Sequence, residues 1–275
     1  MRLLIVYCHP VEGSFGSAVR DAVLETARAG GHEVRLTDLY AEDFDPVMRR
    51  EERIGYHEPG RNERPVARHL EDVRWAEGLI FVHPTWWYGP PAMLKGWLDR
   101  VFVPHVAFKM PTRTRGIRPG LTNIRLIGQV STLGSSWWLW RFMGQPGRRI
   151  ILRGLRSCCA PTCRTFWLGL HAMDTVPEGR RLAFLARVRG GRGALGDGPG
   201  ASSLDVRPPA PDDAPSPRSP AHDPDHPAFD PPPLRPLLPR GRGRRRGASA
   251  VRLGPARTRP RRHAPRGRRG AGRPL

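Results

Sequence analysis

Lysine is almost absent from this sequence, and cysteine is scarce. The 275 residues contain two lysines against 44 arginines, as a GC-rich coding sequence would. The four cysteines form no pair of CxxC motifs, and the apolar start at residues 1–8 is too short for a membrane span and lacks a cleavage site. We therefore expect reduced thiols, no signal peptide and a cytoplasmic protein. A metal site from Cys158, Cys159, Cys163 and a distant histidine is the disfavoured alternative, so no metal is expected.

Aromatic residues are missing from the last third of the chain. After Arg189 the only one is Phe229, and 31 of the 86 residues from 190 to 275 are Pro or Gly. This share exceeds the roughly 25 to 30% at which disorder becomes the default, and little apolar surface is left to offset chain entropy. We therefore predict a folded domain at residues 1–189 and a disordered Arg/Pro/Gly-rich tail at residues 190–275.

The net charge of +21 is divided between these two parts. The tail holds 18 arginines and seven acidic residues, a net charge of +11, and residues 1–189 carry the remaining +10. Basic segments such as residues 240–246 would suit nucleic acid or an anionic surface through counterion release. No aromatic residue is interleaved with that run as a base-stacking surface requires, which disfavours nucleic acid. An out-of-frame extension of a GC-rich gene is the favoured explanation of the tail.

Residues 84–102, PTWWYGPPAMLKGWLDRVF, are the most informative stretch. They follow a continuous apolar run at residues 78–83, which is typical of a parallel strand covered on both faces, and Pro84 is expected to end that strand. Pro90 and Pro91 suit the first turn of a helix with one apolar stripe. Ligands of open α/β sheets lie outside the carboxyl ends of the strands, so the aromatic loop is placed to meet a planar ligand. A role in the core or in a dimer contact is the open alternative.

The amino-terminal residues predict a βαβ unit. A strand at residues 3–7 leads through the turn HPVEGSFG into a helix that ends at Gly30, and residues 33–38 form a second strand. Backbone N–H groups and the positive end of the helix dipole converge at the turn, where His9 and Ser14 add donors, so an anion is expected there. The turn is neither GxGxxG nor a Walker loop, which argues against a classical dinucleotide or nucleoside triphosphate site. His9 as a purely structural residue is the alternative.

Together these segments resemble the flavodoxin-like NAD(P)H:quinone oxidoreductase family. That family includes quinone reductases, modulators of drug activity and ancillary subunits of potassium efflux systems. The resemblance implies an α/β three-layer sandwich with a five-stranded parallel sheet of order 2-1-3-4-5, and a flavin, FAD or FMN, at the carboxyl ends of the strands. The matching segments are His9-Pro10, Ser14-Phe15, residues 31–34 (GHEV), 38–40 (DLY), 44–47 (FDPV) and 84–102, in that order.

The resemblance also assigns residues to the flavin. The phosphate is expected on the loop of His9, Ser14 and Phe15, and the ring against Thr85, Trp86, Trp87 and Tyr88. A third contact is expected after a fourth strand at residues 123–130. It comes from Thr132, Leu133, Gly134 and Ser135, with Leu133 in place of a family glycine and backbone N–H groups facing the charge of the reduced ring. No acid–base residue is assigned, because tryptophans stand where better-known members have Tyr and His.

The rest of the domain is expected to complete the fold. Residues 63–75 predict the second helix, residues 164–170 the fifth strand and residues 177–189 the closing helix. Four arginines between strands four and five either contact the phosphates of a nicotinamide cofactor or, as we favour, form a solvated helix face. Family members are usually dimers, so residues 137–142 are expected to face a partner. The four arginines are Arg148, Arg149, Arg153 and Arg156.

The function that the resemblance implies is that of a flavin-dependent NAD(P)H oxidoreductase. Such a protein passes two electrons through the bound flavin to a quinone-like acceptor, and the cofactor rather than the side chains carries the redox chemistry. Two alternatives stay open. One is a regulatory flavoprotein subunit in peripheral contact with a membrane transporter for potassium efflux. The other is a basic interaction protein whose tail is the working part.

Overall fold

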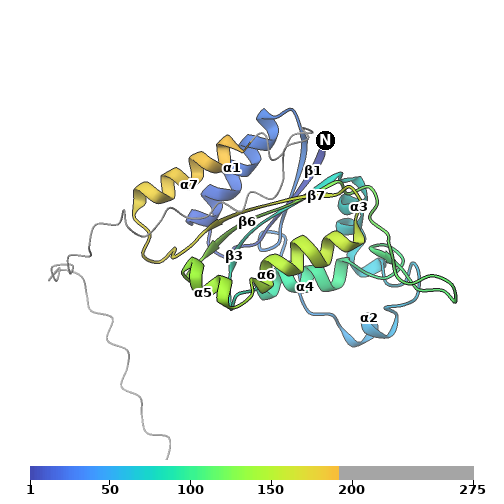
Figure 1. The fold of residues 1–275 in the computed structure, drawn as a ribbon. Helices are drawn as coiled ribbons and strands as arrows, with labels where there is room; N and C mark the ends of the chain where they lie inside the picture. Colours follow the sequence, from blue (N-terminus) through green and yellow to red (C-terminus); the bar gives the residue numbers. More distant parts are fainter. Residues whose placement is uncertain (192–275) are drawn as a thin grey trace, which may run out of the picture. The chain divides into compact units, whose positions relative to one another are not determined.

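The computed structural model describes residues 1–191. Five strands form one parallel sheet: β1 (Arg2–Tyr7), β2 (Glu33–Asp38), β3 (Gly78–Thr85), β6 (Leu126–Leu133) and β7 (Arg164–Leu170). Their order is β2-β1-β3-β6-β7, which confirms the expected order 2-1-3-4-5 (Figure 1). Residues 192–275 lie outside the described residues, so the predicted tail and its boundary stay predictions.

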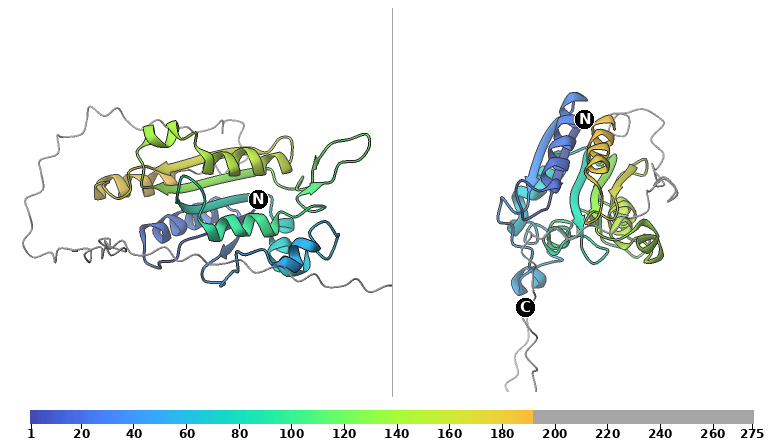
Figure 2. Two further views of the ribbon diagram at one scale, coloured as in Figure 1. Left: turned by 90° about the horizontal axis from the view of Figure 1, so that it is seen from below. Right: turned by 90° about the vertical axis from the view of Figure 1, so that its left-hand side faces the viewer.

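Helices cover both faces of the sheet, which makes three layers (Figures 1 and 2). α1 (Phe15–Ala29) and α7 (Glu178–Gly190) pack on one face. The other face carries α3 (Ala67–Trp75), α4 (Ala92–Val101), α5 (Trp137–Phe142), α6 (Pro146–Arg149) and the π-helix η2 (Ile150–Gly154). Successive residues of a strand point to opposite faces, and both faces of β1 are buried from Leu3 to Tyr7, so the strand is apolar after Arg2.

Several short elements were not predicted. They are the helix α2 (Arg50–Ile54), the 3₁₀-helix η3 (Leu155–Cys158) and the antiparallel pair β4 (Phe108–Lys109) and β5 (Arg118–Pro119). The pair lies at the end of the molecule away from α5 (Figures 1 and 2). The predicted second helix is two elements, because the 3₁₀-helix η1 (Arg64–Val66) precedes α3. Within residues 1–191 no helix has the length and apolar character needed to cross a membrane.

The ends of two strands differ from the prediction. β3 does not stop at Pro84 but continues to Thr85, and β6 runs from Leu126 to Leu133 rather than ending at residue 130. The Val82 carbonyl accepts a hydrogen bond from Cys8 N–H, so the backbone of Pro84, two residues on, faces the same side. β1 pairs with β3 only as far as Val82, so the missing N–H of Pro84 leaves no ladder bond unmade.

The FDPV segment at residues 44–47 holds α4 in place. A Cβ atom added at Gly96 of α4 would lie 2.1 Å from the carbonyl oxygen of Pro46, so only glycine permits this approach. The Arg100 guanidinium, also on α4, donates to Glu52 Oε1 at 2.5 Å and to the carbonyl of Asp45. This part of the family resemblance is therefore structural, and it positions the helix that follows the aromatic loop.

Candidate functional site

Three predicted loops meet at one edge of the sheet because they follow neighbouring parallel strands. β1 pairs with β3, β3 pairs with β6, and the pairing extends to the ends of the strands at Tyr7 with Val82 and at Thr85 with Leu133. The carboxyl ends of β1, β3 and β6 therefore lie side by side. A small void between them is lined by His9, Gly16, Pro84 and Thr132, among others. The predicted phosphate turn and the ends of the strands that lead into the predicted ring loops thus border the same void.

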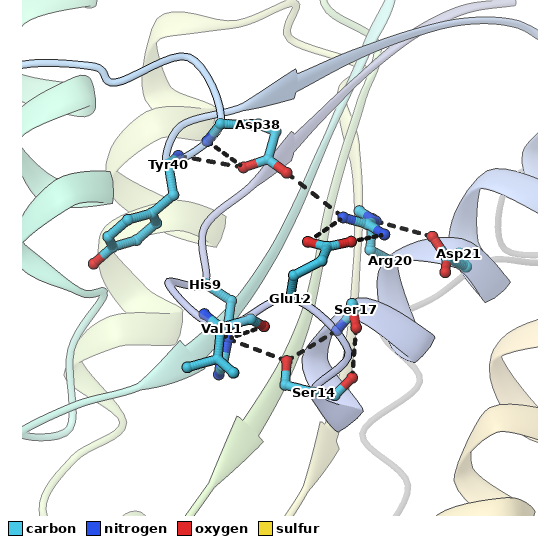
Figure 3. A network of polar contacts seen from close by, with 10 residues as sticks. His9, Val11, Glu12, Ser14, Ser17, Arg20, Asp21, Asp38 and Tyr40 are labelled. Atoms are coloured by element: carbon cyan, nitrogen blue, oxygen red, sulfur yellow. Dashed lines mark hydrogen bonds and ion pairs between the residues drawn. The ribbon is translucent and has the colours of Figure 1, made fainter.

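The turn after β1 is organised by His9 and Ser14 (Figure 3). Val11 N–H donates to His9 Nδ1 at 3.1 Å, and Ser14 Oγ and the Val11 carbonyl each lie 3.1 Å from the same nitrogen. These contacts hold the His9 ring in the turn. Ser14 is the N-cap of α1, and its Oγ accepts from Ser17 N–H at 3.3 Å. The N–H groups of the first turn of α1 remain directed at the space before the helix.

Arg20 does not supply the positive charge of this turn. Its guanidinium lies 3.2 Å from Glu12, 2.9 Å from Asp21 and 3.5 Å from Asp38 (Figure 3). Three carboxylates more than balance the one cation, so this cluster does not attract an anion. An anion at the turn would therefore be held by a ring N–H of His9, backbone N–H groups and the helix dipole. The sequence showed these acidic residues but not that the fold gathers them on Arg20.

Phe15 and Gly16 take different parts in the turn. The Phe15 ring lies 6.4 Å from the Phe184 ring, centroid to centroid, and packs between α1 and α7, so only its backbone faces the turn. A Cβ atom at Gly16 would lie 3.2 Å from His9 Cδ2 and 3.4 Å from Ser14 Oγ. The space between His9 and Ser14 is open because residue 16 has no side chain.

The aromatic loop after β3 is a tight β-hairpin at residues 86–89. Trp86 N–H donates to the Gly89 carbonyl at 3.0 Å, and Gly89 N–H donates to the Trp86 carbonyl at 2.9 Å. The two central residues both have positive φ, 48° at Trp87 and 60° at Tyr88, as a type I′ turn requires. Such turns prefer Asn and Gly, so this backbone conformation is strained when two bulky aromatic residues adopt it. Strain of this kind is typical of ligand-binding loops. The Trp87 side chain is 97% exposed.

Two further segments brace the loops. Gly147 N–H of α6 donates to the Tyr88 carbonyl at 2.9 Å, which fixes the tip of the hairpin. After β7, Ala172 N–H donates to the Ser135 carbonyl at 3.1 Å and Met173 N–H to the Leu133 carbonyl at 2.9 Å. Both loops of the predicted ring site are therefore anchored by backbone contacts.

The hairpin and the loop after β6 enclose a cleft of about 260 Å³, the aromatic cleft, which is lined by Thr85, Trp87, Tyr88, Gly134 and Ser135. These are five of the eleven residues assigned to the flavin, and they come from two strands that are far apart in the sequence. Of the others, Thr132 lines the void beside His9. The Leu133 side chain is buried in the core, and Trp86 closes the hairpin without lining the cleft. Leu133 could therefore contact a flavin only through its backbone.

A buried polar pair lies below the hairpin. His83 Nδ1 is 2.8 Å from the Pro84 carbonyl and Gln129 Nε2 is 3.1 Å from His83 Nε2, so His83 donates to the first and accepts from the second. Burial lowers the pKa of His83 to about 4, although the bond to Pro84 acts against this. Sequence reasoning missed this pair, because one histidine after an apolar run gives no sign of its cross-strand partner.

The residues present fit the flavin that the family resemblance implies. The aromatic cleft is close to the lower limit of small-molecule pockets, about 300 Å³. Among residues 1–191 no charged side chain lines it, as suits a flat and mostly apolar ring. The turn at Gly16 lies at the same edge of the sheet, after the neighbouring strand β1, and offers N–H donors to a phosphate. Ring and phosphate would thus each meet matching chemistry at the same edge.

Fold and site together define a flavodoxin-like α/β protein. Residues 1–141 match the model of a family described by its flavodoxin-like fold. This match takes in just over half of the chain, so the chain belongs to that family. Two of the curated relatives are named NAD(P)H dehydrogenase [quinone] 1 and a third is named an NAD(P)H oxidoreductase, which confirms the resemblance drawn from the sequence.

Three relatives illustrate the similarity. The chain is 32% identical over 123 residues to NAD(P)H dehydrogenase [quinone] 1 of Cavia porcellus, covering 39% of this chain and 45% of that protein. It is 31% identical over 137 residues to an uncharacterized NAD(P)H oxidoreductase of Haemophilus influenzae, covering 50% and 66%. The crystal structure of Smu.1420 from Streptococcus mutans superposes with a TM-score of 0.61 at 28% identity, over 70% of this chain and 98% of that one. The chain thus spans about half to two thirds of these curated relatives' length.

The strain in the hairpin leads to a first prediction. Replacing Trp87 with Asn and Tyr88 with Gly installs the residues that a type I′ turn prefers, so the free energy of unfolding should rise by about 1 to 2 kcal/mol. Flavin affinity should fall by about tenfold or more, because both ring contacts are lost. Urea unfolding and flavin titration measure the two effects, with the exposed Trp138→Asn as control. Unchanged flavin affinity would remove these aromatics from the site, and lower stability would contradict the strain.

Proposed function

We propose that this protein is a flavin-dependent NAD(P)H oxidoreductase that passes two electrons to a quinone or a similar acceptor. The observation that carries the proposal is that the aromatic cleft and the turn before α1 lie at the same edge of the sheet, at the carboxyl ends of the neighbouring strands β1, β3 and β6. The names of the relatives agree with this activity and with a quinone acceptor. When bound, the flavin, FMN or FAD, supplies the two-electron redox chemistry.

The chain's own residues would bind and orient the ring. Trp87 and Tyr88 stack on it or meet its edge, and the strained hairpin holds them there before any ligand arrives. The backbone N–H groups of Gly134 and Ser135 face the ring from the other side and favour negative charge on it. Among residues 1–191 the only titratable side chain that lines the cleft is that of Tyr88, so no general acid or base is assigned.

The proposal extends to assembly and location. The face of α5 beside the hairpin leaves Trp138 66% exposed and Phe142 86% exposed, while Trp140 is buried. We propose that this face meets a second copy of the chain, since exposed aromatic surface of this kind is typical of protein interfaces. A cytoplasmic location, and contact with a membrane transporter, stay predictions; none of the relatives described above is named as a transporter subunit.

Anaerobic titration of the purified full-length protein tests the activity. The protein should copurify with flavin or take it up, NADPH should bleach the visible absorbance band of the flavin, and a quinone should restore it. Dithionite serves as the control that the bound flavin is reducible. A protein that binds no flavin, or whose flavin is reduced by dithionite but by neither NADPH nor NADH, would contradict the proposal.

A further inference from the structure

A second and larger cavity, of about 550 Å³, lies beside the edge strand β7. We call it the arginine cavity, because four of its lining residues are Arg141, Arg148, Arg149 and Arg153; Gln145 and Thr165 also line it. The side chains come from α5, α6, η2 and β7. Its volume is within the range of about 300 to 1,000 Å³ that small-molecule sites occupy. No part of the proposed oxidoreduction at the aromatic cleft uses it.

The charge of the arginine cavity is uncompensated on three of the four arginines. Among residues 1–191 no carboxylate lines it, and Arg141, Arg149 and Arg153 form no ion pair with these residues. Arginines elsewhere in the domain are commonly paired; Arg20, for example, lies among three carboxylates. Like charges around one hollow repel one another and attract an anion, and guanidinium groups bind phosphate oxygens through two parallel hydrogen bonds.

The fourth arginine is held in place. Arg148 Nη1 donates to Gln145 Oε1 at 3.0 Å, and its guanidinium carbon lies 5.4 Å from the centre of the Trp167 ring. Trp167 is itself stacked on Trp140, with ring centres 4.6 Å apart and 13° between the planes. The cavity wall is therefore rigid on this side, which reduces the entropy lost on binding.

α6 connects the arginine cavity to the aromatic cleft. Gly147 donates to the Tyr88 carbonyl at the hairpin, and its neighbours Gln145, Arg148 and Arg149 line the cavity. A ligand with a planar ring at one end and several phosphates at the other would meet chemistry that matches both ends. NADPH has this form, and its 2′-phosphate adds charge that NADH lacks.

We propose that the arginine cavity binds the phosphate groups of a nicotinamide nucleotide and selects the 2′-phosphorylated form. The proposal rests on the proposed function for the identity of the ligand. The arginines that line the cavity differ from the four that the sequence indicated. Arg156 is not part of the cavity, because its Nε–H donates to the Cys163 carbonyl at 2.7 Å, and Arg141 lines it instead.

Calorimetry with adenosine 2′,5′-bisphosphate on the full-length protein tests the cavity without any turnover. The bisphosphate should bind more tightly than adenosine 5′-monophosphate, by about tenfold or more, because hydrogen bonds between charged groups are strong. Arg149→Gln/Arg153→Gln should remove this difference. The matched control, Arg113→Gln/Arg180→Gln, removes two exposed arginine charges elsewhere and should leave it intact. Equal affinity for the two nucleotides, or equal loss in both double variants, would overturn the proposal.

Turnover gives the second measurement. In Arg149→Gln/Arg153→Gln the KM for NADPH should rise by about tenfold or more, and by a larger factor than the KM for NADH. An equal rise of KM for both donors would contradict selection of the 2′-phosphate. A protein that binds the bisphosphate through these arginines but carries no flavin would support the cavity and refute the proposed function, so the two failures are distinguishable.

Discussion

Replacing Ser14 with aspartate should abolish tight flavin binding and leave the domain folded. Aspartate caps helices as well as serine does. A negative charge at the first turn of α1 also interacts favourably with the helix dipole, so the free energy of unfolding should not fall. The same carboxylate would face the phosphate of the flavin. Loss of the hydroxyl donor and repulsion between the two anions should weaken binding by about 100-fold or more.

Ser14→Asn is the matched control for this variant. Asparagine also caps helices well but is neutral, so its flavin affinity should stay within about tenfold of the parent protein. Titration of each flavin-free protein with FMN, followed by the quenching of flavin fluorescence, measures the affinities, and urea unfolding measures stability. Equal flavin affinity in the aspartate and asparagine variants would place the phosphate elsewhere.

The buried histidine of β3 should make the protein sensitive to mild acid. His83 has a pKa of about 4 in the folded protein and about 6.5 when unfolded. Above pH 6.5 neither state binds the proton and stability is unaffected. Between pH 6.5 and 4 only the unfolded state binds it, so unfolding is favoured by about 3 kcal/mol in total when pH 4 is passed.

A comparison with His83→Asn isolates this contribution. Asparagine can still donate to the Pro84 carbonyl but does not titrate, so the variant should lack the part of the pH dependence that His83 provides. Burial also lowers the pKa of His69, but that residue is present in both proteins and cancels in the difference. Unfolding free energies from urea titrations at several pH values give the two curves. Parallel curves from pH 7 to 4 would contradict the low pKa, as would an ordinary titration of the His83 ring by NMR.

The sequence predicted the sheet well because the central strands are buried on both faces. β2 and β7 have the predicted bounds, and α1 begins at its serine cap and ends before Gly30. The prediction that Pro84 ends the strand was wrong, because the effect of a proline depends on whether a neighbouring strand needs its N–H. β1 has already ended at this position. Such information comes only from the register.

The candidate site was predicted in part for the same reason. Motif positions identified the loops after β1, β3 and β6, but not which side chains face the space between them. Leu133 is buried and Phe15 is partly buried by packing against other elements, and nothing local in the sequence shows this. The positive φ values of Trp87 and Tyr88 run against the preferences of both residues, so propensity alone could not indicate the hairpin.

A crystal structure of the full-length protein with its bound flavin tests the central claim most directly. We predict that the ring lies in the aromatic cleft, between Trp87 and Tyr88 on one side and Gly134 and Ser135 on the other, with the phosphate at the Ser14 turn of α1. A flavin bound anywhere else on the domain, or a ring turned out of the cleft with its phosphate away from α1, would contradict it.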